Sequence, residues 1–395
     1  MPGLDDLDAA GRRVLLRADL NVPLDTSGPR PRVADDLRIE ESLPTLRRLR
    51  DAGARVVVMS HLGRPKGGVV EKLRMAPVAE RLASLLGAPV AAAHDVVGDD
   101  ARATVEALGD GEVALLENLR FEPGEEANDD AFAGTLAALG DAYVDDAFGA
   151  AHRAHASVVG VPARLQDAVA GDLLGKELTA LSRLLEDPSR PFVAILGGAK
   201  VSDKLGVIDS LLGRVDRLLL GGAMCFTFLR ARGFDVGASR VEEDRLDAVA
   251  GLLERAGGQG VELLLPTDVV AAEAFDADAG SQRVSADGIP DGWMGLDVGP
   301  ETVERFAAAI GDAGTVLWNG PMGVFEWDAF AAGTQGVARA VAACAGYTVI
   351  GGGDSAAAIR KLGLSGEVSH VSTGGGASLE FIEGRELPGV AALRR

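Results

Sequence analysis

The stretch AILGGAKVSDKLGVIDSLL, residues 194–212, joins an apolar run to a helical pattern through two glycines. An apolar run that ends in glycine and leads into a periodic segment is typical of a strand, a tight turn and a helix. We predict that the helix begins near Ala199, so that Lys200 and Lys204 lie at positions i and i+4 and share one helix face. Lysine occurs only six times in the chain. The spacing alone leaves a functional pair and a chance surface pair equally open.

Short apolar runs alternate with longer helical patterns along the whole chain. Helical patterns closed by glycine, such as MAPVAERLASLLG at 75–87 and DRLDAVAGLLERAGG at 244–258, separate the apolar runs. Strands that alternate with helices in this way are typical of an α/β fold with parallel sheets. The predicted strands are 14–21, 55–61, 89–93, 112–120, 142–148, 192–198, 217–223, 262–266, 315–320, 347–353 and 370–376.

The length of 395 residues exceeds what one hydrophobic core usually supports, so we expect two domains. The boundary is predicted within 160–190, where a leucine-rich helix lies between proline-containing stretches. We therefore expect two doubly wound, Rossmann-like α/β domains with parallel sheets, joined by a hinge helix.

The charge balance argues against several classes of partner. A formal net charge of −20 opposes binding to nucleic acid and to anionic membranes. No apolar segment approaches the roughly 18 residues that a membrane-spanning helix needs, and the N-terminal MPGLDDLDAAGRR has no apolar signal-peptide core. The chain has two cysteines, Cys225 and Cys344, which we expect to be buried thiols in helices. We therefore expect a cytoplasmic protein.

Cationic and polar side chains gather at the strand ends of the first half. Ligands of open α/β sheets bind beyond the carboxyl ends of the strands, and the planar fork of arginine can grip a carboxylate or a phosphate there. A single arginine of this kind is more often an exposed surface charge. Its recurrence at successive strand ends indicates a pocket for an anion. The residues are Asp19, Asn21, Arg38, His61, Arg64, Arg120, His152 and Arg153.

The second half places glycine at its strand ends instead of arginine. Glycine lets backbone N–H groups approach phosphate oxygens, and the following helix N-terminus adds partial positive charge, so these turns indicate a nucleotide. The Walker pattern is absent, and a GxGxxA match that begins at Gly351 lacks the acidic residue that ribose binding by a dinucleotide site requires. The turns are LGGAK (196–200), LGGAM (220–224), WNGPMG (318–323), IGGGDS (350–355) and STGGGA (372–377).

Eight segments occur in a fixed order: RVLLRADLNVPL (13–24), SHLGRPKG (60–67), LLENLRFEPGEE (115–126), DAFGAAHRAHAS (146–157), LGGAKVSDK (196–204), WNGPMGVFE (318–326), GGGDSAAA (351–358) and STGGGASLEFIEG (372–384). Together they closely resemble the phosphoglycerate kinase family, over nearly the whole chain. The departures are small: Leu20 stands where an aromatic is common, Glu122 follows Arg120 and Phe121, and Ser355 stands where threonine is frequent. None of them removes a charged group that the chemistry uses.

The resemblance implies roles for individual residues. Arg38, Lys200 and Gly353 would be catalytic, with Lys200 neutralising the phosphoryl group in transfer. Asp354 would carry Mg²⁺ as Mg-ADP or Mg-ATP. Phosphoglycerate would be bound by Asp19, Asn21, Arg38, His61, Arg64, Arg120 and Arg153. The nucleotide would be bound by Gly197, Gly198, Lys204, Gly295, Glu326, Gly352, Gly353, Asp354 and Ser355, with Gly295 at the base and Glu326 at the ribose.

The resemblance also implies which part of the chain binds which substrate. Residues 1–168 would form a domain that binds phosphoglycerate, and residues 169–379 a domain that binds the nucleotide. The tail 380–395 would pack on the first domain. The expected partners are 3-phosphoglycerate or 1,3-bisphosphoglycerate and ADP or ATP, bound by a monomer.

The reaction implied is reversible phosphoryl transfer between 1,3-bisphosphoglycerate and ADP, which gives 3-phosphoglycerate and ATP in glycolysis. Both reacting oxygens are already anionic, so no general base is required. Two other classes of protein share the doubly wound layout. A nicotinamide-dependent dehydrogenase would bind a dinucleotide, and a non-catalytic binding protein would have no use for Lys200 or Asp354.

Overall fold

The computed structural model describes residues 1–394, which divide into two compact units. The first unit comprises Met1–Thr179 together with the segment that starts at Glu386, and the second comprises Ala180–Arg385. The division falls within helix α6 (Asp172–Glu186). Each unit has its own parallel sheet with helices, so the expected α/β fold class is confirmed.

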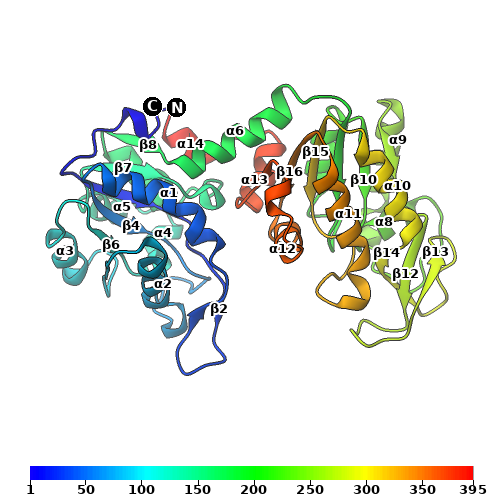
Figure 1. The fold of residues 1–395 in the computed structure, drawn as a ribbon, viewed down its shortest axis with the longest axis horizontal. Helices are drawn as coiled ribbons and strands as arrows, with labels where there is room; N and C mark the ends of the chain where they lie inside the picture. The colour runs from blue at the N-terminus through cyan, green and yellow to red at the C-terminus, as the bar shows by residue number, and fades with distance from the viewer. Residues whose placement is uncertain (395) are drawn as a thin grey trace. The chain divides into compact units, whose positions relative to one another are not determined.

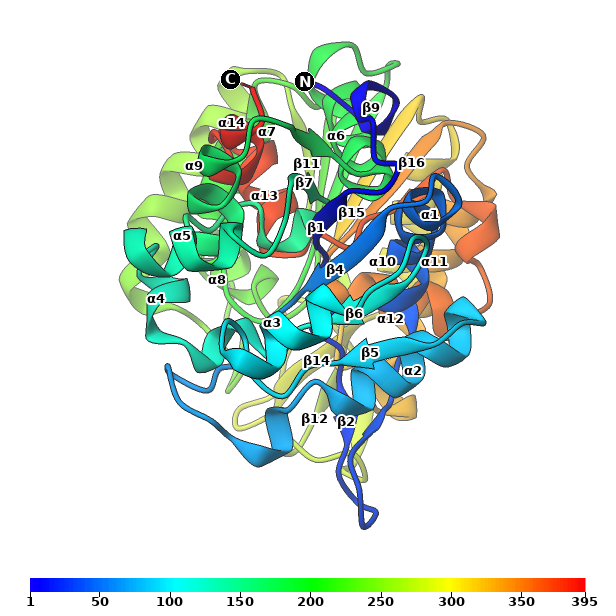
Figure 2. The same cartoon turned by 90° about the vertical axis from the view of Figure 1, so that its left-hand side faces the viewer.

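The first unit is built on six parallel strands in the order β5-β6-β4-β1-β7-β8. Figure 2 shows β5, β6, β4 and β1 side by side. Its strands are β1 (Arg13–Arg17), β2 (Leu24–Asp25), β3 (Arg32–Val33), β4 (Arg55–Met59), β5 (Val90–Ala92), β6 (Val113–Leu115), β7 (Ala142–Asp145) and β8 (Ala168–Ala170). Its helices are α1 (Leu37–Asp51), α2 (Ala76–Leu86), α3 (Asp99–Glu106), α4 (Pro123–Glu126), α5 (Asp130–Ala137), the first part of α6, and α14 (Pro388–Ala392).

Alternation along β1 builds the core of the first unit. Val14 and Leu16 point to one face of the sheet, where they join a cluster that includes Leu46 of α1 and Val78 of α2. Successive side chains of a strand point to opposite faces, so one strand can supply cores on both sides. The carboxyl end of β1 is thereby held rigidly for the polar residues that follow it.

The second unit has a six-stranded parallel sheet in the order β11-β10-β9-β15-β16-β17, flanked by helices (Figure 1). Its strands are β9 (Phe192–Leu196), β10 (Arg217–Leu220), β11 (Glu262–Leu264), β12 (Asp268–Ala272), β13 (Ser281–Ser285), β14 (Met294–Val298), β15 (Thr315–Asn319), β16 (Tyr347–Gly351) and β17 (His370–Val371). Its helices are α7 (Leu205–Leu212), α8 (Cys225–Ala231), α9 (Leu246–Gly258), α10 (Pro300–Gly311), α11 (Ala332–Ala343), α12 (Gly353–Lys361) and α13 (Gly376–Ile382).

Every predicted strand is present, and each ends before its predicted last residue. The predicted strand 14–21 is β1, which ends at Arg17, and the predicted strand 112–120 is β6, which ends at Leu115. The prediction that glycine ends each helix holds for α2, where Gly87 adopts a left-handed conformation with φ 71°. Helix α9 also ends where predicted, at Gly258, although its C-cap is the following residue, Gln259.

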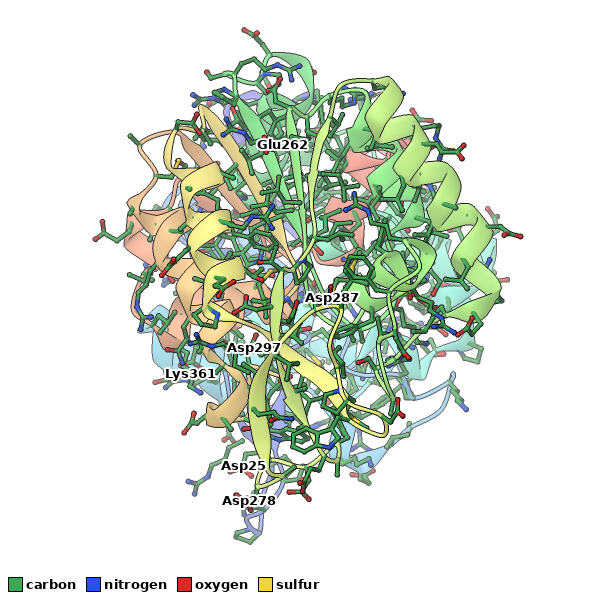
Figure 3. The ribbon with its side chains drawn as sticks, turned by 90° about the vertical axis from the view of Figure 1, so that its right-hand side faces the viewer. Asp25, Glu262, Asp278, Asp287, Asp297 and Lys361 are labelled. Atoms are coloured by element: carbon green, nitrogen blue, oxygen red, sulfur yellow. The ribbon has the colours of Figure 1, made fainter. Side chains whose placement is uncertain are left out.

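The sequence analysis missed a second sheet in the second unit, in which β12 pairs antiparallel with both β13 and β14. Figure 3 shows the strands of this sheet, with Asp278 in the connection between β12 and β13 and Asp297 within β14. Strand β13 is mostly exposed and polar, so it carries no apolar run that would predict a strand. This sheet forms one wall of the candidate site.

The two cysteines are both free thiols. Cys225 is buried in α8, and burial raises its pKa above the ordinary range. Cys344 directly follows α11 and is half-buried, so its expected place inside a helix is wrong. None of the helices within residues 1–394 combines the length and the apolar character that crossing a bilayer requires.

Helix α6 begins on partners from the first unit. The amides of Leu173 and Leu174 donate to Oδ1 of Asp146, at 2.9 and 3.3 Å, and the amide of Asp172 donates to the hydroxyl of Thr45. First-turn amides have no partner within their own helix, so these contacts satisfy them. Asp146 is fully buried, and burial raises its pKa to about 7.

The raised pKa of Asp146 makes stability depend on pH. A carboxyl whose pKa is higher in the folded chain binds more protons when folded, so the unfolding free energy falls as pH rises between the unfolded and the folded pKa. Asp146→Asn keeps the acceptor for α6 and does not ionise. We expect wild type to lose about 2–3 kcal/mol of unfolding free energy relative to this variant between about pH 5 and about pH 8.

Urea denaturation of wild type and Asp146→Asn at several pH values measures this difference. If the difference in unfolding free energy between wild type and Asp146→Asn does not change with pH, the carboxyl of Asp146 is already ionised at the lower pH and the prediction is wrong. The exposed Asp278→Asn is the matched control for loss of one charge.

Candidate functional site

The carboxyl ends of four neighbouring strands of the second unit carry the glycine turns. β10, β9, β15 and β16 are adjacent and parallel, so the turns after them meet at one edge of the sheet. The turns pack backbone to backbone. A Cβ on Gly197 would lie 2.1 Å from the carbonyl oxygen of Pro321, and a Cβ on Gly222, whose φ is 64°, would lie 2.4 Å from the amide nitrogen of Gly198. Only glycine permits this approach.

Gly197→Ala tests this packing. The added methyl group meets backbone atoms that cannot move aside, so we expect the unfolding free energy to fall by roughly 1–3 kcal/mol and the KM for ATP to rise. Denaturation curves and initial rates measure the two effects. Gly213→Ala, which adds a methyl group into open space at the end of α7, is the matched control. Equal stability of the two variants would contradict the close approach.

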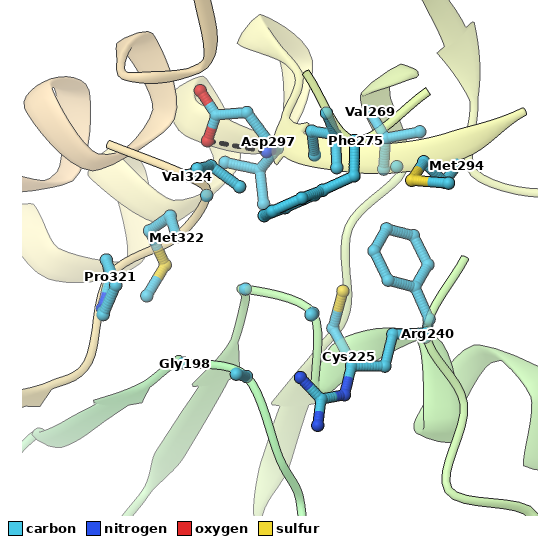
Figure 4. Close-up of a pocket in the computed structure, with 18 of the residues that line it drawn as sticks. Gly198, Cys225, Arg240, Val269, Phe275, Met294, Asp297, Pro321, Met322 and Val324 are labelled. Carbon is cyan, nitrogen blue, oxygen red and sulfur yellow. Dashed lines mark hydrogen bonds between the residues drawn. The ribbon is translucent and has the colours of Figure 1, made fainter. Parts of the chain in front are cut away.

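A cavity of about 530 Å³ lies beside these turns, within the size range of small-ligand sites. Its walls are mainly apolar and come from α8 and from the small antiparallel sheet, with Val269 and Met294 among them (Figure 4). Phe226 of α8 lines the cavity as well. Gly295 lies in the lining, and a Cβ there would lie 2.1 Å from the ring of Phe226. Glu326 also lines this cavity. A mainly apolar cavity with a few polar groups suits a nucleotide base and ribose.

Two further groups shape the rim and wall of this cavity. Phe275, which is 64% exposed, lies against Trp327 with ring centroids 4.7 Å apart. Asp297 is buried and accepts hydrogen bonds from the amides of Val298 and Gly333, at 2.9 and 2.7 Å. Burial raises the pKa of Asp297 to about 7. These two backbone amides therefore hold the carboxyl group of Asp297 in place in the cavity wall.

A second cavity, of about 420 Å³, shares Gly198, Ala199, Pro321 and Asp354 with the first. Most of its other lining residues belong to the glycine turns, and its charged and polar side chains are Lys200, Asp203, Lys204, Asn319, Asp354 and Ser355. Gly197, Gly352 and Gly353 line it as well. Since the two cavities share residues, an apolar slot continues into a polar one, which matches a base followed by a chain of phosphates.

The N-terminus of α12 faces the polar cavity. Gly352 caps this helix with φ 86°, a left-handed conformation that favours glycine, and Gly353 is its first residue. The hydroxyl of Ser355 accepts from the amide of Gly320 at 2.6 Å, which ties α12 to the turn after β15. The helix spans nine residues. Its free amides and macrodipole place partial positive charge at the cavity.

The prediction that Lys200 and Lys204 share a helix face is wrong. Helix α7 begins at Leu205, and Lys204 is its N-cap. The preceding residues form a turn that starts at Gly198, whose φ is 109°, and Ser202 anchors that turn by donating to Oε1 of Glu242 at 2.6 Å. Both lysines nevertheless line the polar cavity, because the turn brings them to it.

The two lysines have different surroundings. Lys204 is half-buried, its amine donates to Oδ1 of Asn319, and burial lowers its pKa. Lys200 is exposed at the cavity. The structure therefore has one lysine that is held by Asn319 and one lysine that is exposed.

The first unit gathers a second polar cluster at the carboxyl ends of β1 and β4. Arg38, in the first turn of α1, forms an ion pair with Asp19. Burial alone would raise the pKa of Asp19, but the charge of Arg38, together with that of Arg17, lowers it below the ordinary value. His61 is buried, and burial lowers its pKa well below the ordinary range. These residues form a compact, mainly cationic group.

Other predicted residues of the first unit hold the loop that starts at Gly63. Asn21 Oδ1 accepts from the amide of Gly63 at 2.9 Å, and Arg120 donates to the carbonyl oxygen of Gly63 at 2.8 Å. Arg64 is exposed on that loop and lies within electrostatic range of Arg120. Arg153 is exposed beside His155 and has no contact with Asp19 or Arg38 among the interactions of residues 1–394.

Sequence reasoning missed three contributors. Arg17 is 1% exposed and contacts His61, although its position at the end of an apolar strand was a usable signal. Asn319 binds Lys204, and its place before a glycine turn could have indicated it. The apolar wall comes from β12 and β14, and neither of these strands was predicted.

Comparison with known proteins shows which protein family the chain is similar to. The family model described as phosphoglycerate kinase matches residues 4–385. The phosphoglycerate kinase of Salinispora tropica is 60% identical over 398 residues, which cover 99% of this chain and 98% of that protein. That of Synechococcus elongatus is 55% identical over 396 residues, which cover 100% of this chain and 98% of that protein.

Solved structures agree with the sequence comparison. The phosphoglycerate kinase from Coxiella burnetii superposes with a TM-score of 0.86 at 40% identity, over 99% of this chain and 98% of that chain. The enzyme from Pyrococcus horikoshii superposes with a TM-score of 0.85 at 33% identity, over 100% and 98%. With its two α/β units, its glycine turns and its cationic cluster, the chain belongs to the phosphoglycerate kinase family.

Proposed function

We propose that this chain catalyses the reversible transfer of a phosphoryl group between 1,3-bisphosphoglycerate and ADP, which gives 3-phosphoglycerate and ATP in glycolysis. The observation that carries the proposal is the apolar cavity that continues into a glycine-lined polar cavity, in a chain of this family. The first cavity fits a base and the second fits phosphates. The enzyme is a phosphotransferase with a carboxyl group as acceptor.

The second unit binds the nucleotide in this proposal. Gly295 lines the base position and Glu326 the ribose position, while Gly197, Gly198 and Lys204 hold phosphates. Gly352, Gly353 and Ser355 add the N-terminus of α12, with the Gly353 amide directed at the transferring group.

Asp354 is the residue that would hold Mg²⁺. Mg²⁺ in phosphoryl-transfer sites is usually bound by one or two carboxylates together with substrate phosphates and water. Asp354 lines both cavities, and no cluster of three or more His, Cys, Asp or Glu ligands occurs within residues 1–394, so a single carboxylate that shares the ion with the nucleotide fits this donor set. When bound, the ion neutralises charge on the phosphates.

The first unit binds phosphoglycerate in this proposal. A cationic cluster at strand ends suits a ligand that carries a phosphate and a carboxylate. The proposed ligands of the substrate are Asp19, Asn21, Arg38, His61, Arg64, Arg120 and Arg153. Asp19 acts mainly by orienting Arg38, with which it is paired.

Catalysis rests on positioning and on charge neutralisation. Both reacting oxygens are anionic, so no side chain has to remove a proton. Arg38, Lys200 and the Gly353 amide each supply a positive charge or a hydrogen-bond donor that stabilises negative charge on the transferring group. The exposed Lys200 follows the group in transfer, and the anchored Lys204 stays with the nucleotide.

A coupled ATP assay with 3-phosphoglycerate and Mg²⁺ tests the function. Phosphoglycerate-dependent consumption of ATP supports it, and none from a folded preparation overturns it. Titration followed by NADH fluorescence separates a dehydrogenase, and calorimetry with 3-phosphoglycerate alone separates a binding protein. We further propose a cytoplasmic monomer, which light scattering after size exclusion tests for the oligomeric state.

A further inference from the structure

A chain of buried hydrogen bonds leads from α4 to His61 in the first unit. Ser157, in a short π-helix at Ala156–Gly160, donates its hydroxyl to Oε1 of Glu125 at 2.6 Å and its amide to Oε2 at 2.9 Å. Arg17 Nε donates to the same hydroxyl oxygen at 2.9 Å, and Arg17 Nη2 lies 3.1 Å from Nδ1 of His61. The four side chains belong to residues that are 6% exposed or less.

The donors and acceptors of this chain can be arranged in only one way. A hydroxyl has a single proton, and Ser157 gives it to the carboxylate of Glu125, so its oxygen can only accept from Arg17. A guanidinium has no acceptor and does not deprotonate. The ring nitrogen of His61 that faces Arg17 must therefore be unprotonated. A neutral imidazole then carries its one proton on Nε2.

The surrounding charges favour this neutral ring. His61 is buried and faces Arg17 from β1, Arg38 from α1 and Arg120 from the segment after β6, with one anion, Asp19, from the turn after β1. Burial and the three arginines oppose a charged imidazolium, and Asp19 alone favours it. Glu125 pairs with Ser157 at the far end of the chain, so it holds Arg17 and does not face the ring.

We infer that Arg17, held by Ser157 and Glu125, is a positioning residue that fixes His61 as a neutral imidazole with its proton on Nε2. His61 then donates a hydrogen bond to an anion at the site and never presents a lone pair to it. The identity of that anion as phosphoglycerate rests on the proposed function. Arg17 itself is buried, so it acts on the substrate through His61.

Nitrogen NMR of the full-length protein labelled in its five histidines tests the tautomer directly. The His61 resonances are assigned by their loss in His61→Gln. In wild type without substrate we expect an unprotonated Nδ1 and a protonated Nε2, unchanged between about pH 5.5 and about pH 8. In Arg17→Met we expect a mixture of tautomers and a ring that titrates in this range. Wild-type His61 with its proton on Nδ1 overturns the inference.

Kinetics test the consequence for the substrate. In Arg17→Met we expect the KM for 3-phosphoglycerate to rise at pH 8 in proportion to the fraction of His61 that carries its proton on Nδ1, about twofold for an equal mixture, with kcat and the KM for ATP unchanged. Protonation at lower pH restores a donor, so this KM falls again as the ring titrates. A variant whose KM rises equally at every pH contradicts a role through the tautomer.

Rescue and control variants separate positioning from general damage. Arg17→Lys keeps a charged donor for Nδ1 and should keep the wild-type tautomer, which also tests the inference if Arg17→Met does not fold. Arg13→Met, on the same strand and paired with the half-exposed Asp141, should change neither the tautomer nor the KM. Loss of the tautomer in Arg17→Lys counts against the inference. The spectra are recorded without substrate, so they stand even if the coupled assay fails.

Discussion

Replacing Lys200 by alanine should lower kcat by roughly 10²–10³-fold, while the KM for ATP stays within several-fold. Lys200 is exposed at the polar cavity, so in the resting enzyme it is not committed to a buried partner. Its contact is expected to strengthen only as charge spreads over the transferring group. An interaction made mainly in the transition state appears in kcat and not in KM.

Steady-state rates with varied ATP and 3-phosphoglycerate measure the effect of Lys200→Ala. Lys204→Ala should differ, with a raised KM for ATP, because the amine of Lys204 is fixed to Asn319 before any substrate arrives. Lys361→Ala, at an exposed position on α12, is the control for loss of a surface lysine from the same unit. A nearly normal kcat with a steep rise in the KM for ATP would make Lys200 a ground-state ligand of the nucleotide.

Arg38→Lys should lose roughly 10²-fold in kcat/KM for 3-phosphoglycerate, although the charge is kept. The guanidinium of Arg38 pairs with Asp19 on one side and has further N–H groups that can bind the substrate at the same time. A lysine ammonium is a compact point charge that cannot reproduce this planar fork.

The control for Arg38→Lys is Arg47→Lys on the exposed side of the same helix, where the guanidinium donates to the carbonyl oxygen of Leu85. We expect that variant to retain wild-type rates. If Arg38→Lys were as active as Arg47→Lys, Arg38 would supply only a diffuse field, and the bidentate role would be wrong.

The large sheets were predictable because their strands are nearly continuous apolar runs that end in glycine or in a polar cluster. Strand β9, FVAIL, is buried at every position, which is typical of a parallel strand covered on both faces. The small sheet was not predictable. Its strand β13 pairs with β12 across a long connection, and four of its five residues are exposed.

The error over Lys200 and Lys204 has a physical cause. Local spacing cannot distinguish a helix that starts at Ala199 from a turn that delays the helix to Leu205. The turn is held by Glu242, which lies 40 residues further along the chain, and by the conformation of Gly198. Long-range anchors of this kind leave no periodic signal, so the predicted geometry was wrong although both lysines line the same cavity.

The first unit contains residues from both ends of the sequence. Leu387 and Val390 are buried in it, and the amide of Gly389 donates to the carbonyl oxygen of Ala151 at 2.9 Å, beside the small cluster of Ala147, Ala150 and Val158. During synthesis this cluster must therefore stay uncovered while the ribosome translates the whole second unit. A chain that stalls or is cleaved before Glu386 would contain the complete second unit. The cluster of Ala147, Ala150 and Val158 in the first unit would then stay uncovered. Chaperone binding and proteolysis of such fragments should consequently target the N-terminal half, although the missing residues are C-terminal.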